Sequence, residues 1–182
     1  MNVWCVMKNY KSLYVVAVLS FMLVFSLTES TAVAQAADHF FSVGARAGVG
    51  IPHGDINNFF DPNIAATADL EYHATDQFSI GGVFGYHRFS GPFSSAANIY
   101  RISANGKFYP GTGPLRPFFN GGGGAYVFDS GTTKFGMHVG GGLQFRAWPK
   151  TWIEVEYNFH NVFTSGSNVK FSTVQGGVRF RF

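Results

Sequence analysis

The last ten residues of the chain, Thr173-Val174-Gln175-Gly176-Gly177-Val178-Arg179-Phe180-Arg181-Phe182, decide the fold. The even-numbered positions are all apolar or glycine, whereas the odd-numbered positions are all polar, charged or glycine. An α-helix would mix the two sets, but successive side chains of a β-strand point to opposite faces of the sheet. The stretch therefore predicts a strand with one apolar face and one polar face.

The same alternation recurs upstream of this strand. Glu154 and Glu156, for example, alternate with Ile153 and Val155. The alternating segments predict eight strands, near 40–50, 64–73, 78–89, 99–109, 117–128, 133–146, 152–160 and 171–182. The third and fifth segments are less regular because glycine interrupts both of their faces, but an even number of strands places both ends of a barrel on one side of the membrane.

The composition indicates a membrane protein. Charged residues make up only 13% of the chain, whereas about 25% is usual for a water-soluble domain. Beyond the N-terminal region, no segment has the roughly 18 consecutive apolar residues that a transmembrane helix needs, so a closed barrel is the remaining way to satisfy the backbone in lipid. The predicted fold class is all-β: an eight-stranded antiparallel up-and-down transmembrane β-barrel.

The predicted connections between strands alternate in length. Long connections are expected at 51–63, 90–98 and 161–170, and shorter ones at 74–77, 110–116 and 147–151. This is the outer-membrane arrangement, with tight turns in the periplasm and larger loops outside the cell. Residues 129–132 break the rule, so we expect the third outer loop to be short.

The N-terminal segment predicts a signal peptide. Lys8 and Lys11 precede a mostly apolar run at 13–27, and Ala34-Gln35-Ala36 supplies the small residues that signal peptidase accepts. The alternative, a membrane anchor helix, is disfavoured because the run is shorter than the roughly 20 residues that span a bilayer. We expect residues 1–36 to be a signal peptide cleaved after Ala36 or Ala34, and residues 37–182 to form one barrel domain.

Three pieces of the chain resemble the small outer-membrane β-barrel proteins of Gram-negative bacteria, of the OmpA transmembrane-domain and OmpX type. They are the Pro-aromatic-glycine segment 116–124, the hairpin from Gly140 to Tyr157, and the aromatic end with Val178, Phe180 and Phe182. The resemblance implies localisation in the cell outer membrane, contact with its lipid and lipopolysaccharide, and recognition of that aromatic end by the barrel-assembly machinery. It implies no single activity, because family members serve in membrane integrity, adhesion and surface protection.

Charged residues on the predicted inward faces suggest a polar plug. They are Arg46, Asp69, Glu71, Arg101, Lys107, Lys134, Arg146, Glu154, Glu156, Arg179 and Arg181. Strand order places Arg46 near Asp69, and places the two glutamates between Arg146 on one side and Arg179 with Arg181 on the other. An eight-stranded interior is only wide enough for side chains, so we interpret these residues as paired filling. The alternative, an acid/base pair of Glu154 and Glu156, needs divergent pKa values that the neighbouring arginines oppose.

The histidines and glycine runs give no cofactor or metal site. His73, His87, His138 and His160 are predicted to point inward, whereas His39 and His53 fall outside the predicted strands. Because His73 is expected near the periplasmic end and His87 and His160 near the outer end, we do not expect the inward histidines to converge on a metal. The glycine runs 121–124 and 140–142 open no helix and are not followed by the Lys-Ser or Lys-Thr of a phosphate-binding loop. The only cysteine, Cys5, lies ahead of the apolar run.

These observations favour an outer-membrane structural or surface-interaction protein, expected to be a monomer without catalytic, cofactor-binding or metal-binding residues. One alternative is a lipid A-modifying barrel enzyme of PagL type, but His160 is followed by Asn161 and Val162 rather than by a nearby serine. Another is a small-solute pore, which eight strands make too narrow for porin-like conduction. The formal net charge of +3 gives no support for a nucleic-acid partner.

The outer loops are the expected place for any surface ligand on a host. Loop 51–63 is the best candidate because Phe59 and Phe60 form an aromatic pair, and exposed paired aromatics often touch lipid or a partner. Membership of the aromatic girdle at the membrane interface is the equally open reading of these two rings.

Overall fold

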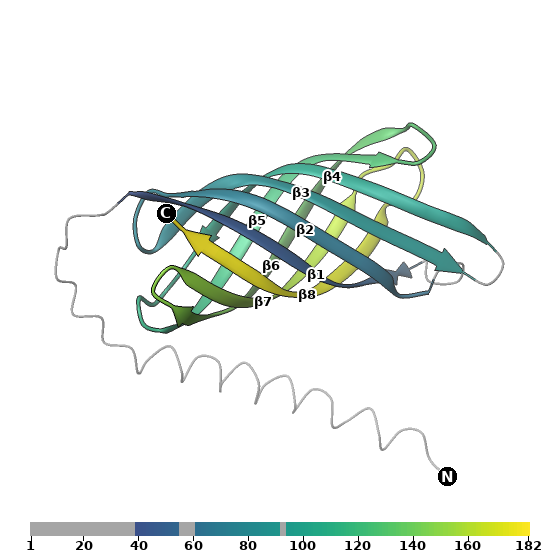
Figure 1. Ribbon diagram of the computed structural model, residues 1–182. Coiled ribbons are helices and arrows are strands. Elements are labelled where there is room, and N and C mark those ends of the chain that lie inside the picture. Colours follow the sequence, from purple (N-terminus) through teal and green to yellow (C-terminus); the bar gives the residue numbers. More distant parts are fainter. Residues whose placement is uncertain (1–38, 55–60, 92–93) are drawn as a thin grey trace, which may run out of the picture. The chain divides into compact units, whose positions relative to one another are not determined.

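The computed structural model describes residues 39–54, 61–91 and 94–182, which form a closed barrel (Figure 1). Its strands are β1 (Phe40–His53), β2 (Asn63–His73), β3 (Phe78–Gly91), β4 (Ser94–Phe108), β5 (Leu115–Phe128), β6 (Thr133–Trp148), β7 (Thr151–Val162) and β8 (Val169–Arg181). Each strand is antiparallel to the next, and β1 closes the barrel against β8. The predicted eight-stranded antiparallel up-and-down barrel is confirmed. The predicted signal peptide, residues 1–36, lies outside the described residues.

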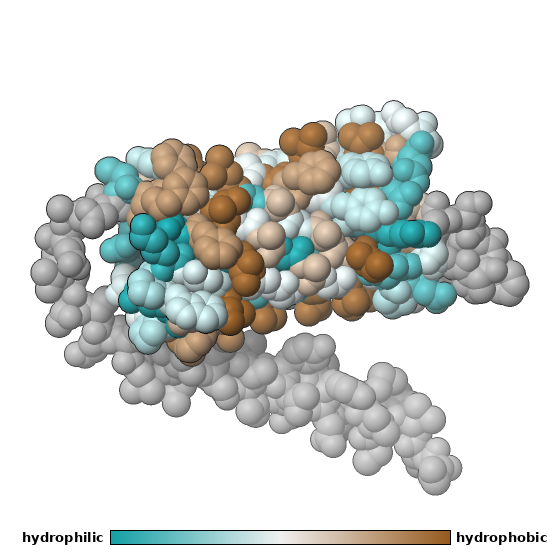
Figure 2. Space-filling view, in the orientation of Figure 1, coloured by the Kyte–Doolittle hydropathy of each residue, from teal (hydrophilic) through white to brown (hydrophobic). Residues whose placement is uncertain are grey.

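The apolar and polar faces lie as the alternation predicts. Ile102, Phe135 and Val139 point outward and are 63%, 58% and 61% exposed, respectively. Figure 2 shows hydrophobic residues over much of the barrel wall and hydrophilic residues gathered toward its two ends. This wall fits a hydrocarbon environment, since a water-soluble protein rarely exposes so many large apolar side chains together. In the described part of the chain, no helix is long and apolar enough to cross a membrane.

Several strands are longer than the sequence pattern predicts. The predicted long loop 90–98 is wrong, because β3 continues to Gly91 and β4 already begins at Ser94. The outer loops predicted at 51–63 and 161–170 are likewise shortened to 54–62 and 163–168. Backbone pairing in these strands continues beyond the residues in which apolar and polar side chains alternate. The turns at 74–77 and 129–132 lie where they were predicted.

Glycine permits close contact between strands at several inward positions. A Cβ atom added to Gly122 would lie 2.0 Å from the backbone oxygen of Ala104, and one added to Gly140 would lie 2.0 Å from that of Tyr157. Real Cβ atoms do not approach an oxygen so closely, so any larger residue would push the strands apart. The glycine runs therefore serve the tight coiling of a small barrel.

Candidate functional site

A cluster of seven charged side chains fills the middle of the barrel. It is called the charge plug below, and it consists of Arg46 on β1, Asp69 and Glu71 on β2, Lys107 on β4, Glu154 and Glu156 on β7, and Arg179 on β8. Every member is at most 4% exposed. Buried charges are costly unless they are paired, so the arrangement of their partners decides what the interior can do.

Each cation of the charge plug bridges two or more carboxylates. Arg46 forms an ion pair with Asp69, and its Nη1 lies 2.6 Å from Glu154 Oε1. Arg179 Nη2 lies 2.6 Å from Asp69 Oδ2, and Arg179 Nε lies 3.1 Å from Glu154 Oε2. Lys107 Nζ lies 2.8 Å from Glu71 Oε1. The network therefore links side chains from five strands across the interior.

Two glycines make these long-range ion pairs feasible. Gly177 on β8 lies in register between Arg46 and Glu154, and a Cβ there would meet Arg46 Cγ at 2.7 Å. Gly44 on β1 lies in register between Asp69 and Arg179, and a Cβ there would lie 2.7 Å from Arg179 Nη2. Because both positions lack a side chain, each ion pair reaches over the intervening strand.

The predicted pairing of the interior charges is partly confirmed. Arg46 does contact Asp69, and Arg179 does contact Glu154. The prediction is wrong for Arg146 and Arg181, because the residue opposite Glu154 on β6 is Gln144, whereas Arg146 is opposite Trp152 nearer the strand end. Gln144 Nε2 donates a hydrogen bond to Glu154 Oε2 at 2.9 Å.

The geometry of Glu154 and Glu156 favours filling over acid/base chemistry. Both carboxylates bind Arg46, and the two residues are 1% and 3% exposed. Both carboxylates are thus paired with the same guanidinium, whereas an acid/base pair needs two carboxyl groups in different environments, one protonated and one ionised. Neither carboxylate can be reached by a substrate without breaking the network.

Three histidines lie together in the outer half of the interior. The ring centroids of His87 and His160 are 5.4 Å apart, and those of His138 and His160 are 5.7 Å apart. His87 and His160 were predicted near the same outer end, and His138 joins them because the register places it directly opposite His160. His73 lies elsewhere, stacked on Phe40 at 4.1 Å.

The neighbours of these histidines do not suggest a cation site. His160 Nδ1 lies 3.3 Å from Arg101 Nη1 and 3.0 Å from the hydroxyl oxygen of Tyr126. His138 Nε2 lies 3.0 Å from Asn105 Oδ1. Among the described residues, no group of His, Cys, Asp or Glu has an arrangement suited to a metal ion. The guanidinium beside His160 would also repel a cation.

An apolar cluster closes the barrel beyond the histidines. It contains Phe89, Ile99, Tyr126, Val162 and Phe171, each at most 3% exposed. Phe171 stacks on His160 with centroids 4.4 Å apart. The charge plug and this cluster leave the interior filled with side chains over much of its length.

The contacts of His160 do not support a role as a catalytic histidine. Another histidine, His53, lies close to a serine, Ser172, at the outer end of the barrel. His160 is buried among Arg101, Tyr126 and Thr173. In contrast, His53 Nε2 lies 2.7 Å from Ser172 Oγ, and the Tyr157 hydroxyl lies 2.8 Å from the same oxygen. This pair was not predicted, because the alternation of residues placed His53 in a loop, whereas β1 extends to that residue.

A second group of arginines lies at the opposite end of the barrel. The guanidinium carbons of Arg181, Arg146 and Arg116 lie 4.1, 5.0 and 5.6 Å from the ring centroid of Trp152. We call these three arginines and Trp152 the arginine mouth. Arg116 was predicted to lie in the connection 110–116, but it belongs to β5 and is 2% exposed.

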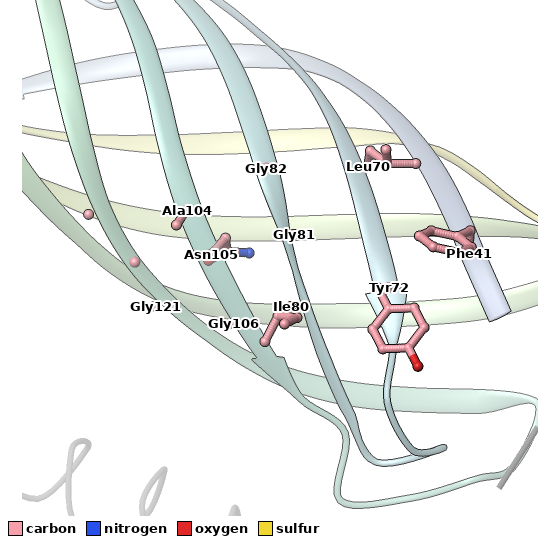
Figure 3. Close-up of a pocket in the computed structure, with 12 residues that line it drawn as sticks. Phe41, Leu70, Tyr72, Ile80, Gly81, Gly82, Ala104, Asn105, Gly106 and Gly121 are labelled. Atoms are coloured by element: carbon pink, nitrogen blue, oxygen red, sulfur yellow. The ribbon is translucent and has the colours of Figure 1, made fainter. Parts of the chain in front are cut away.

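A shallow groove lies on the outer wall of the barrel (Figure 3). It is lined by Phe41, Leu70, Tyr72 and Ile80 beside glycines of the neighbouring strands. A Cβ added to Gly82 would meet no atom within 4 Å, so this outward-facing glycine shapes the surface rather than relieving a clash. The groove forms part of the apolar wall that faces lipid.

The comparisons with known proteins agree with this geometry. A family model described as "Outer membrane protein beta-barrel domain" matches residues 18–182, so the chain belongs to this family and is an outer-membrane protein. The predicted resemblance to small outer-membrane barrels of OmpA type is therefore confirmed. No match to the chain was found among curated proteins.

Solved structures of small outer-membrane barrels are similar in fold. Neisserial surface protein A has 16% sequence identity and a TM-score of 0.67, over 78% of this chain and 97% of that chain. The N-terminal β-barrel domain of Pseudomonas aeruginosa OprF has 16% identity and a TM-score of 0.52, over 78% and 97%. The outer membrane protein AlkL has 14% identity and a TM-score of 0.55, over 85% and 95%. At this level of identity, the similarity concerns the fold alone.

Proposed function

We propose that the protein is a non-catalytic barrel of the outer membrane that acts through its surface and its outer loops rather than through its interior. The observation that carries this proposal is the charge plug, in which Arg46, Lys107 and Arg179 each bridge at least two carboxylates. A buried network of this kind stabilises a closed interior and leaves no room for a substrate path. The membrane role then depends on the wall and on the loops.

The proposed surface interaction is tested by binding of the purified protein to lipopolysaccharide and to host-cell surfaces. Loop 51–63 remains the preferred contact, although Phe59 and Phe60 lie outside the described residues. The variant Phe59→Ser/Phe60→Ser is expected to lose binding, whereas Ser130→Ala in the short turn 129–132 is the control expected to retain it. Absence of binding by the unmodified protein to either surface would contradict the interaction part of the proposal.

We also propose that residues 1–36 are removed as a signal peptide and that the C-terminal aromatic residues direct assembly into the outer membrane. N-terminal sequencing of protein from the outer membrane should begin after Ala36 or Ala34 if residues 1–36 are a signal peptide. Phe182, with Phe180 and Val178, is proposed to be read by the barrel-assembly machinery. Deletion of Phe182 should then lower outer-membrane yield far more than it lowers the stability of protein refolded in detergent. Equal losses in both settings would remove recognition from the account.

A second candidate function, hydrolysis of lipid acyl esters, rests on the pair of His53 and Ser172. The short separation of Nε2 and Oγ, 2.7 Å, is typical of a hydroxyl activated by an imidazole. The candidate ranks second because Ser172 is 1% exposed and lies on a strand whose backbone N–H groups are already paired, which leaves no donors for an oxyanion. Incubation with lipopolysaccharide and mass spectrometry for released fatty acid, with Ser172→Ala as the control, separates the two functions.

A further inference from the structure

The arginine mouth concentrates positive charge at the end of the barrel where the chain terminus lies. Arg116, Arg146 and Arg181 surround the ring of Trp152, and Arg181 also lies over Phe40, with 5.0 Å between its guanidinium carbon and the ring centroid. Aromatic faces attract each guanidinium, but they do not neutralise the charge. Three like charges around one indole therefore repel one another unless an anion joins them.

Within the described ranges, no carboxylate forms an ion pair with these three arginines. Every ion pair formed by an arginine there belongs to Arg46 or Arg179 of the charge plug. Arg116 is held by backbone oxygens instead: its Nε donates to Gly111 O at 2.9 Å, and its Nη2 donates to the carbonyl of Asp76. Arg116 is therefore a fixed charge, positioned by two turns; the Asp76 carboxylate acts on it electrostatically but forms no ion pair with it.

Buried hydrogen-bond donors at the same place also lack acceptors. Trp152 Nε1 is one, in a residue that is 0% exposed, and Arg181 Nε and Nη2 are two more. Indole and guanidinium nitrogens can only donate, so the group that satisfies them must accept hydrogen bonds. Unpaired buried donors are unusual in folded proteins, and here they coincide with the unbalanced charge.

The cluster is accessible from its own end of the barrel. Arg146 is exposed and Arg181 is half-buried, whereas Trp152 and Arg116 beneath them are buried. A tetrahedral group with several acceptor oxygens can bond donors that approach from different directions, whereas a carboxylate offers only two oxygens in one plane. Guanidinium groups bind such oxygens in pairs.

From these observations we propose that the arginine mouth is a binding site for a phosphate group, presented at the periplasmic end of the barrel. Arg146 and Arg181 bind its oxygens, Trp152 Nε1 donates to it, and Arg116 supplies a fixed positive charge. The phosphate is carried either by a soluble periplasmic molecule or by the headgroup of an inner-leaflet phospholipid. The site thus gives the barrel a second functional surface, distinct from its outer loops.

The test uses the fluorescence of Trp152 in protein purified from outer membranes. The protein carries Trp148→Phe, which leaves Trp152 as the only tryptophan among the described residues. The measured fluorescence therefore reports on the arginine mouth. The protein is titrated with inorganic phosphate, with short-chain phosphatidic acid, and with acetate and chloride at matched ionic strength. We expect a saturable change with a phosphate ligand, weakened about tenfold or more in Arg146→Gln/Arg181→Gln, since charge-assisted hydrogen bonds are lost.

Arg88→Gln is the matched control, because Arg88 is an exposed arginine on β3 near the other end of the barrel. This variant should bind phosphate as the unmodified protein does. A response to inorganic phosphate assigns a soluble ligand, and a response to phosphatidic acid alone assigns a lipid headgroup; both support the site. An equal response to chloride or acetate, an unchanged response in the double variant, or no saturable response would overturn the proposal.

Discussion

Two groups of arginines face the inside of the same barrel, and they differ in their partners. Arg46 and Arg179 in the charge plug are bound to carboxylates from neighbouring and non-neighbouring strands. Arg116, Arg146 and Arg181 at the arginine mouth stack on Trp152 and form no ion pair with a described residue. An inward arginine that is paired with carboxylates therefore fills and stabilises the interior, whereas an inward arginine without an ion pair carries a charge that can bind a ligand.

The proposed phosphate site requires the arginine mouth to face the periplasm. This orientation predicts an all-or-none result in a cysteine-labelling experiment. In a Cys5→Ser background, Gly166→Cys in the connection 163–168 should react with a membrane-impermeant maleimide on intact cells. Lys150→Cys in the turn between β6 and β7 should react only after the outer membrane is permeabilised. The inverse pattern would turn the barrel around and place the arginine mouth outside the cell.

Removal of a plug carboxylate should produce the largest loss of stability. Glu154→Leu leaves Arg46 and Arg179 with fewer partners in a poorly hydrated interior, and a broken buried ion pair costs on the order of 3 kcal/mol. We therefore expect the free energy of unfolding, measured by a urea or guanidinium titration in detergent, to fall by about this amount. Unchanged stability would show that the network is not structural.

A smaller loss is expected when one glycine that admits an ion pair is replaced. Gly177→Ala places a methyl group 2.7 Å from Arg46 Cγ and 2.0 Å from the oxygen of Ala45, and overpacking of this kind costs about 1 to 3 kcal/mol. Gly176→Ala is the matched control, since its Cβ would come no closer than 3.8 Å to Glu154 O. The same titration should separate the two variants; equal stability would argue against the steric role of Gly177.

The smallest effect on stability is expected at the arginine mouth. Arg181→Gln removes a charge that is repelled by Arg116 and Arg146 and has no carboxylate partner, so the free energy of unfolding should change by no more than about 0.5 kcal/mol. Comparison with Glu154→Leu under the same denaturant conditions is the control. A loss as large as that of the plug variant would erase the difference between the two groups of arginines.

The wall of the barrel could be predicted from the sequence because period-two alternation is a local property. The strand number, the outward apolar face and the pairing of Arg46 with Asp69 all follow from alternation and from the order of neighbouring strands. Contacts across the interior do not: Arg46 on β1 reaches Glu154 on β7, which is not its neighbour. The sequence feature that could have predicted such a contact is a glycine at an inward position between two oppositely charged residues, as at Gly44 and Gly177.

The register of neighbouring strands and the exact strand ends could not be predicted from the sequence either. The meeting of His138 with His160 depends on a register that strand order alone does not fix. His53 and Arg116 were assigned to connections because the apolar alternation stops before the backbone pairing does. The pair of His53 and Ser172 and the arginine mouth were therefore both missed, since each lies near a strand end.

The central claim is that the interior is closed by paired side chains and that the protein acts through its surfaces. Single-channel recording of the purified protein in a planar lipid bilayer tests this claim most directly. We expect no steady openings across a range of applied voltages, because the charge plug and the apolar cluster around Phe171 fill the lumen. Steady, large openings of the unmodified protein would contradict the claim.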